Sequence, residues 1–173
     1  QQVFTEGRIV YDVTIDPPAN QEGLQQYSGT YTVTVKGKHI RRELNMDNGF
    51  NSVLLLNTED NADYSLKKAG DKYYAIELDP ADREKEQKRY RGFTLKEECC
   101  SISIAGMNTL KGTVLYTDGS SAEIYYSTDW QPVTGLFDRF PGMQVMPLDF
   151  VYKGDDGLRT HFRATDMKSE PVE

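Results

Sequence analysis

The chain has 173 residues and a formal net charge of −7, with 38% hydrophobic and 27% charged residues. A chain of this length can bury about 70% of its unfolded surface, so one folded domain over residues 1–173 is expected. The composition argues against a disordered chain. The negative charge without a convincing basic patch argues against nucleic-acid binding. In addition, no apolar run approaches the roughly 20 residues of a membrane-spanning helix.

Alternating apolar and polar residues predict short β-strands along the first half of the chain. Hairpin turns are expected at Lys36-Gly37, Asp47-Asn48-Gly49 and Gly70-Asp71; Asn-Gly supplies the positive φ values of a tight connection. The expected strands cover residues 9–15, 31–35, 38–44, 53–56, 64–66 and 74–78. Because these strands are short and joined by turn signals, the first half is predicted to be an antiparallel meander.

The strand pattern breaks at Asp79-Pro80. Asp79 is a good N-cap and Pro80 a good first helical residue. Residues 81–91 are almost wholly charged and lack a broad apolar stripe. They are therefore predicted to form a short surface helix or a mobile connection.

Strand signals resume at Phe93, and Asp118-Gly119 is the strongest hairpin turn in the chain. Residues 134–140 could form one or two helical turns, ended by Pro141-Gly142. The later strands are expected at residues 93–95, 102–104, 110–116, 124–126, 146–152 and 158–164. The predicted fold class is mainly β: an antiparallel curled sheet of about 10–11 strands, in a half-barrel or open barrel, with two or three short helices covering the concave face.

The two cysteines, Cys99 and Cys100, are adjacent. Neighbouring side chains of a strand point to opposite faces, so a bond between them requires a distorted backbone. Both are therefore expected to be unbridged, with one packed inward as a small hydrophobic residue. A vicinal disulfide, a redox site and an intermolecular bridge are the alternatives.

The sequence lacks a constellation that indicates catalysis or metal binding. Ser65 and Lys68 fit Ser-x-x-Lys but have no companion motifs. The two histidines, His39 and His161, have no metal-ligand spacing. The polar loop 57–63 lacks the glycine and glutamate of a calcium loop. We expect no enzymatic activity, no metal site and no cofactor.

Eleven Tyr, seven Phe and one Trp make up 11% of the chain, and many fall on alternating inward positions. They could simply fill a core, because Tyr and Phe favour strands. They could instead line an apolar concavity that holds a ligand, with Trp130, Phe137 and Phe140 in a lid. The candidate cavity-lining residues are Tyr11, Tyr31, Tyr64, Tyr74, Phe93, Tyr116, Tyr126, Trp130, Phe137, Phe140, Phe150 and Phe162.

The order of short motifs along nearly the whole chain resembles a family of secreted bacterial domains of unknown function, which is similar in fold to the periplasmic lipoprotein-localisation carriers. The motifs are Gly7-Arg8-Ile9-Val10-Tyr11, Val35-Lys36-Gly37-Lys38-His39-Ile40-Arg41, Lys72-Tyr73-Tyr74, Ile104-Ala105-Gly106 and Thr128-Asp129. The resemblance implies secretion across the inner membrane, with a signal peptide removed. It also implies an antiparallel half-barrel closed by helices, around a hydrophobic cavity suited to acyl chains.

Two functions are compatible with these observations. The first is a non-enzymatic periplasmic or cell-surface binding protein that shelters an apolar ligand, such as lipid or lipoprotein acyl chains. The second is an envelope interaction or sensor scaffold domain with a solid core and no small-molecule ligand. An empty apolar interior would favour the first function, and a filled one the second.

Overall fold

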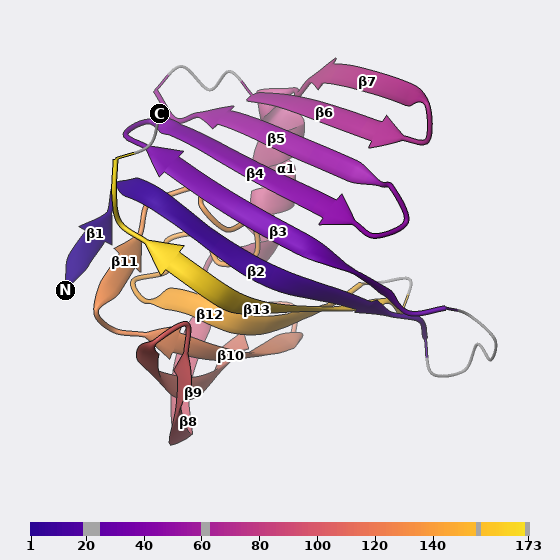
Figure 1. Cartoon of the computed structure of the whole chain (residues 1–173). Coiled ribbons are helices and arrows are strands. Elements are labelled where there is room, and N and C mark those ends of the chain that lie inside the picture. Colours follow the sequence, from indigo (N-terminus) through magenta and orange to yellow (C-terminus); the bar gives the residue numbers. More distant parts are fainter. Residues whose placement is uncertain (19–24, 60–62, 155–156, 172–173) are drawn as a thin grey trace.

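Eleven strands form one curled antiparallel sheet in the computed structural model, which describes residues 1–18, 25–59, 63–154 and 157–171. Their order is β7-β6-β5-β4-β3-β2-β13-β12-β10-β9-β8, so the sheet is open, with β7 and β8 at its edges (Figure 1). The strands are β2 (Glu6–Asp16), β3 (Tyr27–Lys36), β4 (His39–Met46), β5 (Asn51–Asn57), β6 (Asp63–Ala69), β7 (Lys72–Glu77), β8 (Thr94–Ile104), β9 (Met107–Leu115), β10 (Ser121–Ser127), β12 (Met146–Lys153) and β13 (Arg159–Lys168). The predicted mainly β class and curled antiparallel sheet are confirmed.

The two halves of the chain meet at β13, which lies between β2 and β12 (Figure 1). Strands β2 to β7 are neighbours both in sequence and in the sheet, so the predicted meander is confirmed. In the β2–β13 pair, Tyr11 is opposite Ala164 and Val13 is opposite Phe162, and all four side chains are buried. This pairing of distant segments places aromatic residues from both ends of the chain on the inner face of the sheet.

Side-chain hydrogen bonds support two of the predicted turns. Between β4 and β5, the Asn48 Oδ1 accepts from the Phe50 backbone N–H at 3.0 Å. Between β9 and β10, the Asp118 Oδ1 accepts from the Ser120 backbone N–H at 2.9 Å. The glycine that follows each of these residues has a positive φ, as a tight hairpin requires.

One helix, α1 (Pro80–Tyr90), is found in the described ranges, instead of the two or three expected. The predicted cap is confirmed, because the Asp79 side chain accepts from the Ala81 N–H at 2.9 Å, and Pro80 is the first helical residue. The helix buries no side chain, in agreement with its charged sequence. Among the described helices, none has the length and apolarity needed to cross a membrane.

The second predicted helix, over residues 134–140, is wrong: these residues form turns and irregular backbone. Gly135 adopts a φ of +90°, outside the helical range. The apolar residues of this stretch pack against the sheet, and that packing outweighs the weak local helix signal. Irregular backbone therefore takes the place of one of the helices expected over the concave face.

A two-stranded parallel sheet joins the N-terminus to the segment that follows β10. It pairs β1 (Gln2–Phe4) with β11 (Trp130–Pro132), and Gln2 lies opposite Trp130. This pairing was not expected, because parallel neighbours can be far apart in sequence and need no turn signal between them.

The expectation of unbridged cysteines is wrong, because Cys99 and Cys100 form a vicinal disulfide. The β8–β9 register shifts between Glu97 and Ser101, and Cys100 has a φ of +80°. The bulge removes the strand alternation on which the expectation depended. Both cysteines are exposed on an edge strand of the sheet.

Candidate functional site: the concave face and the segment that fills it

The segment 133–145, which connects β11 to β12, fills the concave face of the sheet; we call it the plug segment. Its described backbone hydrogen bonds are turns, from Leu136 N–H to the Val133 carbonyl and from Met143 N–H to the Phe140 carbonyl, both at 3.2 Å. Its large apolar side chains are buried: Leu136, Phe137, Phe140 and Met143. Side-chain packing thus contributes most of what holds this segment in place.

The plug segment and the sheet meet in one aromatic cluster around Phe150 of β12. The ring centroid of Phe150 lies 5.8 Å from that of Phe137 and 5.4 Å from that of Phe140, both in the plug segment. On its other sides it lies 5.5 Å from Tyr11 of β2 and 4.9 Å from Phe162 of β13. The space in which an apolar ligand was expected is therefore occupied by the protein's own side chains. This closed arrangement matches the filled interior of the second function, and the first function requires the plug segment to move aside.

Two polar contacts join the plug segment to the sheet. The Arg42 Nη1 on β4 lies 2.8 Å from the Asp138 Oδ1 of the plug segment, and the Tyr116 hydroxyl donates to the Arg139 carbonyl at 2.5 Å. Arg42 is buried, and its Nε and Nη2 atoms have no hydrogen-bond partner among the described residues. The side chain of Asp138 is more than half exposed. This ion pair therefore joins a buried cation to the rim of the site.

Asp138 of the plug segment also lies close to α1. Arg83 of α1 forms an ion pair with Asp63 of β6, and its Nη2 lies 4.0 Å from the Asp138 Oδ1. The ion pair with Asp63 thus holds α1 against the sheet, next to Asp138 of the plug segment.

Burial controls the protonation of the polar groups under the plug segment. It raises the pKa of the Tyr11, Tyr31 and Tyr152 phenols, so they keep their protons at a pH at which an exposed tyrosine loses its own. Burial disfavours the charge of Arg42, but nearby Tyr31 and Asp138 outweigh it, and the pKa of Arg42 is raised. The concave face thus carries a charged guanidinium among neutral phenols.

We expect the free energy of unfolding to fall as the pH rises above about 10, the ordinary pKa of tyrosine. The unfolded chain then loses phenolic protons that the folded chain keeps, at a cost of about 1.4 kcal/mol per pH unit for each buried tyrosine. Urea unfolding between pH 8 and pH 11 measures this slope. Tyr152→Phe should make it shallower, whereas Tyr27→Phe, at an exposed position, should leave it unchanged. Equal slopes in both variants would contradict the attribution of this pH dependence to buried tyrosines such as Tyr152.

The structure brings six of the twelve predicted cavity residues together on the concave face. They are Tyr11, Tyr31, Phe137, Phe140, Phe150 and Phe162. Phe137 and Phe140, which were expected in a lid above the concavity, insert into the concave face. The reason is that several side chains of this connecting segment are large and apolar, and burying them against the sheet removes them from water.

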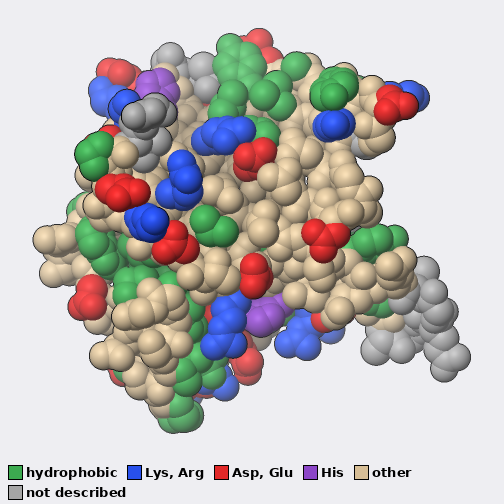
Figure 2. Space-filling view, in the orientation of Figure 1, with side chains coloured by type: hydrophobic (Ala, Val, Ile, Leu, Met, Phe, Trp, Pro, Cys, Tyr) green, Lys and Arg blue, Asp and Glu red, His purple; other side chains and the backbone are tan. Residues whose placement is uncertain are grey.

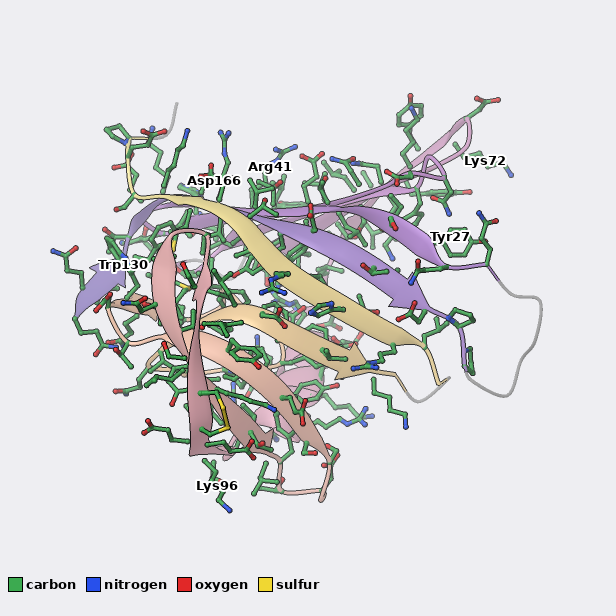
Figure 3. All side chains as sticks on the ribbon, turned by 60° about the horizontal axis from the view of Figure 1, so that its bottom comes forward. Tyr27, Arg41, Lys72, Lys96, Trp130 and Asp166 are labelled. Carbon is green, nitrogen blue, oxygen red and sulfur yellow. A yellow bond between two sulfur atoms is a disulfide. The ribbon has the colours of Figure 1, made fainter. Side chains whose placement is uncertain are left out.

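The other six residues lie outside this set of mutual ring contacts, although Phe93, Tyr116, Tyr126 and Trp130 belong to the same hydrophobic core or pack against it. Phe93 and Tyr116 contact each other at 6.4 Å between ring centroids, beside α1, and Tyr126 is buried on β10. Trp130 packs edge-on against Phe4 at 5.7 Å, at the end of the molecule where β1 lies (Figure 3). The remaining two lie on opposite faces of the sheet near its β7 edge: Tyr64 of β6 is on the outer face, which it shares with Arg41, and Tyr74 of β7 is on the other face.

The β6–β7 edge exposes a group of large apolar side chains, which Figure 2 shows above the neighbouring Lys and Arg side chains. They are Tyr64, Leu66, Tyr73, Tyr74 and Ile76. A groove of about 400 Å³ lies on the outer face there, with Val53 and Leu66 in its floor and Arg41 and Lys68 on its walls. Alternation within one strand could not indicate which of these residues share a face, because that depends on the register between strands.

Sequence reasoning missed the polar residues of the site. Arg42 falls on the inward positions of its strand, between Ile40 and Leu44, and this charge in an apolar alternation was the available signal. Asp138 had no such signal, because its place depends on the path of an irregular segment.

The described part of the chain contains no group of three or more His, Cys, Asp or Glu residues suited to a metal. The Nε2 of His161 lies 2.8 Å from the Oδ1 of Asp149, which is a local side-chain pair between β12 and β13. Part of the polar loop 57–63 lies outside the described residues.

No family model matches the sequence, and no curated protein does. Among solved structures, the chain is similar to MucB of Pseudomonas aeruginosa in its complex with MucA, with 12% sequence identity and a TM-score of 0.47. The alignment covers 96% of this chain and 53% of the MucB chain, so this chain spans about half the length of MucB. It is also similar to a β-barrel-like protein of a domain of unknown function from Brucella abortus (10% identity, TM-score 0.43, 97% and 99% covered). A LolA superfamily protein from Nitrosomonas europaea is a third (11% identity, TM-score 0.44, 98% and 88% covered). The structural neighbours thus include a domain of unknown function and a LolA superfamily protein.

Proposed function

We propose that this chain is a non-enzymatic binding domain of the periplasm or cell surface, whose concave face shelters an apolar ligand such as a lipid acyl chain once the plug segment has moved aside. One observation carries the proposal: a connecting segment without regular secondary structure supplies the side chains that fill the concave face. Because few backbone hydrogen bonds hold this segment, it can leave without breaking the strand pairing of the sheet.

The energies of the plug segment and of a ligand are similar in size. Burying the four apolar side chains Leu136, Phe137, Phe140 and Met143 contributes roughly 6–12 kcal/mol. Ten methylenes of an acyl chain would contribute about 8 kcal/mol before the costs of association. A ligand of this size could therefore replace the plug segment against the same aromatic wall.

The vicinal disulfide Cys99–Cys100 supports the proposed location. Disulfides persist in oxidising compartments such as the periplasm and the cell surface and are rare in the cytosol.

Titration with the fluorescent fatty acid cis-parinaric acid tests this function. We expect one saturable site in the wild-type chain, and about tenfold tighter binding by Asp138→Ala, because loss of the Arg42–Asp138 ion pair favours release of the plug segment. Glu123→Ala, which removes an exposed carboxylate on β10, is the matched control and should bind as the wild type does.

The absence of saturable binding by both the wild type and Asp138→Ala would contradict this function. It would favour the second candidate, an interaction domain with a solid core. The observation behind that candidate is the exposed aromatic edge at β6 and β7, where an extended segment of another protein could pair with β7.

A further inference from the structure

A second pocket, of about 380 Å³, lies at the rim of the concave face and is formed by four separate segments. They are the end of α1, the turn between β9 and β10, the plug residue Arg139, and the end of β12. We propose that this pocket binds the phosphate group of a phosphate monoester. The site is present with the plug segment in place, so this inference goes beyond the function proposed above.

Arg139 is held in the pocket by two aromatic rings. Its guanidinium carbon lies 4.6 Å from the ring centroid of Tyr152 and 5.2 Å from that of Tyr90. No carboxylate of the described residues forms an ion pair with Arg139. In a chain of net charge −7, a guanidinium that is positioned in this way and lacks a carboxylate partner is available for an external anion.

The rest of the lining favours negative charge as well. Arg89 and Lys153 also line the pocket, and none of the described residues in its lining is acidic. Charge compensation comes from Asp118, whose Oδ2 lies 3.5 Å from the Nε of Arg89. This carboxylate partly neutralises Arg89, so the anion site depends mainly on Arg139 and Lys153.

The geometry points to a phosphate monoester because of its charge and shape. Such a group carries about two negative charges at pH 7, which matches Arg139 and Lys153. The planar guanidinium can donate two parallel hydrogen bonds to phosphate oxygens, and Ser121 belongs to the same lining. The Tyr90 and Tyr116 rings, 5.4 Å apart and edge to face, offer an apolar surface for the group that is esterified.

Calorimetric titration of the full chain with phenyl phosphate at low salt tests the site. We expect saturable binding, weakened at least tenfold in Arg139→Gln and several-fold in Lys153→Gln. Arg139→Lys, which keeps the charge but loses the planar fork, should fall between wild type and Arg139→Gln. Arg8→Gln removes an exposed cation on β2 and should bind within twofold of wild type.

Failure of the wild type to bind, or equal binding by wild type and Arg139→Gln, would overturn the proposal. Lys153→Gln, at an exposed position, keeps the test valid if Arg139→Gln fails to fold. Cosedimentation with phosphatidic acid vesicles, against phosphatidylcholine vesicles, distinguishes the source of the phosphate: an Arg139-dependent difference assigns a lipid headgroup, and binding of phenyl phosphate alone assigns a soluble ester. These results are independent of fatty-acid binding, so the two proposals can fail separately.

Discussion

Replacing Phe140 with Ala is expected to lower the free energy of unfolding by about 3–5 kcal/mol, the usual cost of removing a buried phenyl group. Phe140 is 2% exposed, and its ring contacts those of Phe150 and Tyr152. Chemical denaturation measures the loss.

The same substitution should tighten the binding of a fatty acid at least tenfold. Phe140 belongs to the plug segment, so its packing energy stabilises only the closed state. Removing it lowers the cost of moving the plug segment aside, and each 1.4 kcal/mol of that cost corresponds to a factor of about ten in affinity. Titration with cis-parinaric acid, under conditions where the variant remains folded, gives the ratio.

Phe150→Ala is the matched control, because Phe150 is equally buried but belongs to the wall of the sheet. It should cost a similar amount of stability. The affinity of Phe150→Ala for the fatty acid should stay within a few-fold of the wild type. The substitution removes the same contact with the wall of the sheet from the plug segment in the closed state and from the ligand in the open state. Equal tightening in both variants would mean that any cavity in this core binds the probe, which would contradict exchange with the plug segment.

Replacing Gly7 with Ala is expected to destabilise the fold by roughly 2–6 kcal/mol, the sum of backbone strain and overpacking. Gly7 has a φ of +147°, and a Cβ at this position would lie 2.2 Å from the Lys168 carbonyl oxygen and 2.7 Å from the Phe4 Cζ. The β2–β13 pairing and the packing of β1 both require that residue 7 has no side chain. This also explains the glycine of the motif Gly7-Arg8-Ile9-Val10-Tyr11.

Gly37→Ala separates steric crowding from backbone preference. Gly37 has a φ of +60°, and no atom lies within 4 Å of the place that a Cβ would take, so only the backbone cost of about 1–2 kcal/mol applies. Urea unfolding of both variants provides the comparison. A Gly7→Ala chain no less stable than Gly37→Ala would contradict the close approach of β2 and β13.

Local signals in the amino-acid sequence were sufficient to predict most of the strands, several of the turns and the helix cap. Alternation along β2 and β3, Asn48-Gly49 and Asp79-Pro80 are such signals, because they act through backbone preferences and through the two faces of one strand. The meander from β2 to β7 followed from the same signals, since each of its strands pairs with the next one along the chain.

What occupies the concave face depends on the tertiary structure. The insertion of β13 beside β2, the entry of Phe137 and Phe140 into the core and the pairing of Arg42 with Asp138 join residues that are far apart in sequence. Such contacts depend on how an irregular segment competes for apolar surface against water and ligand, and no periodic pattern encodes that competition. The aromatic wall could thus be expected from the sequence, whereas the plug segment that covers it could not.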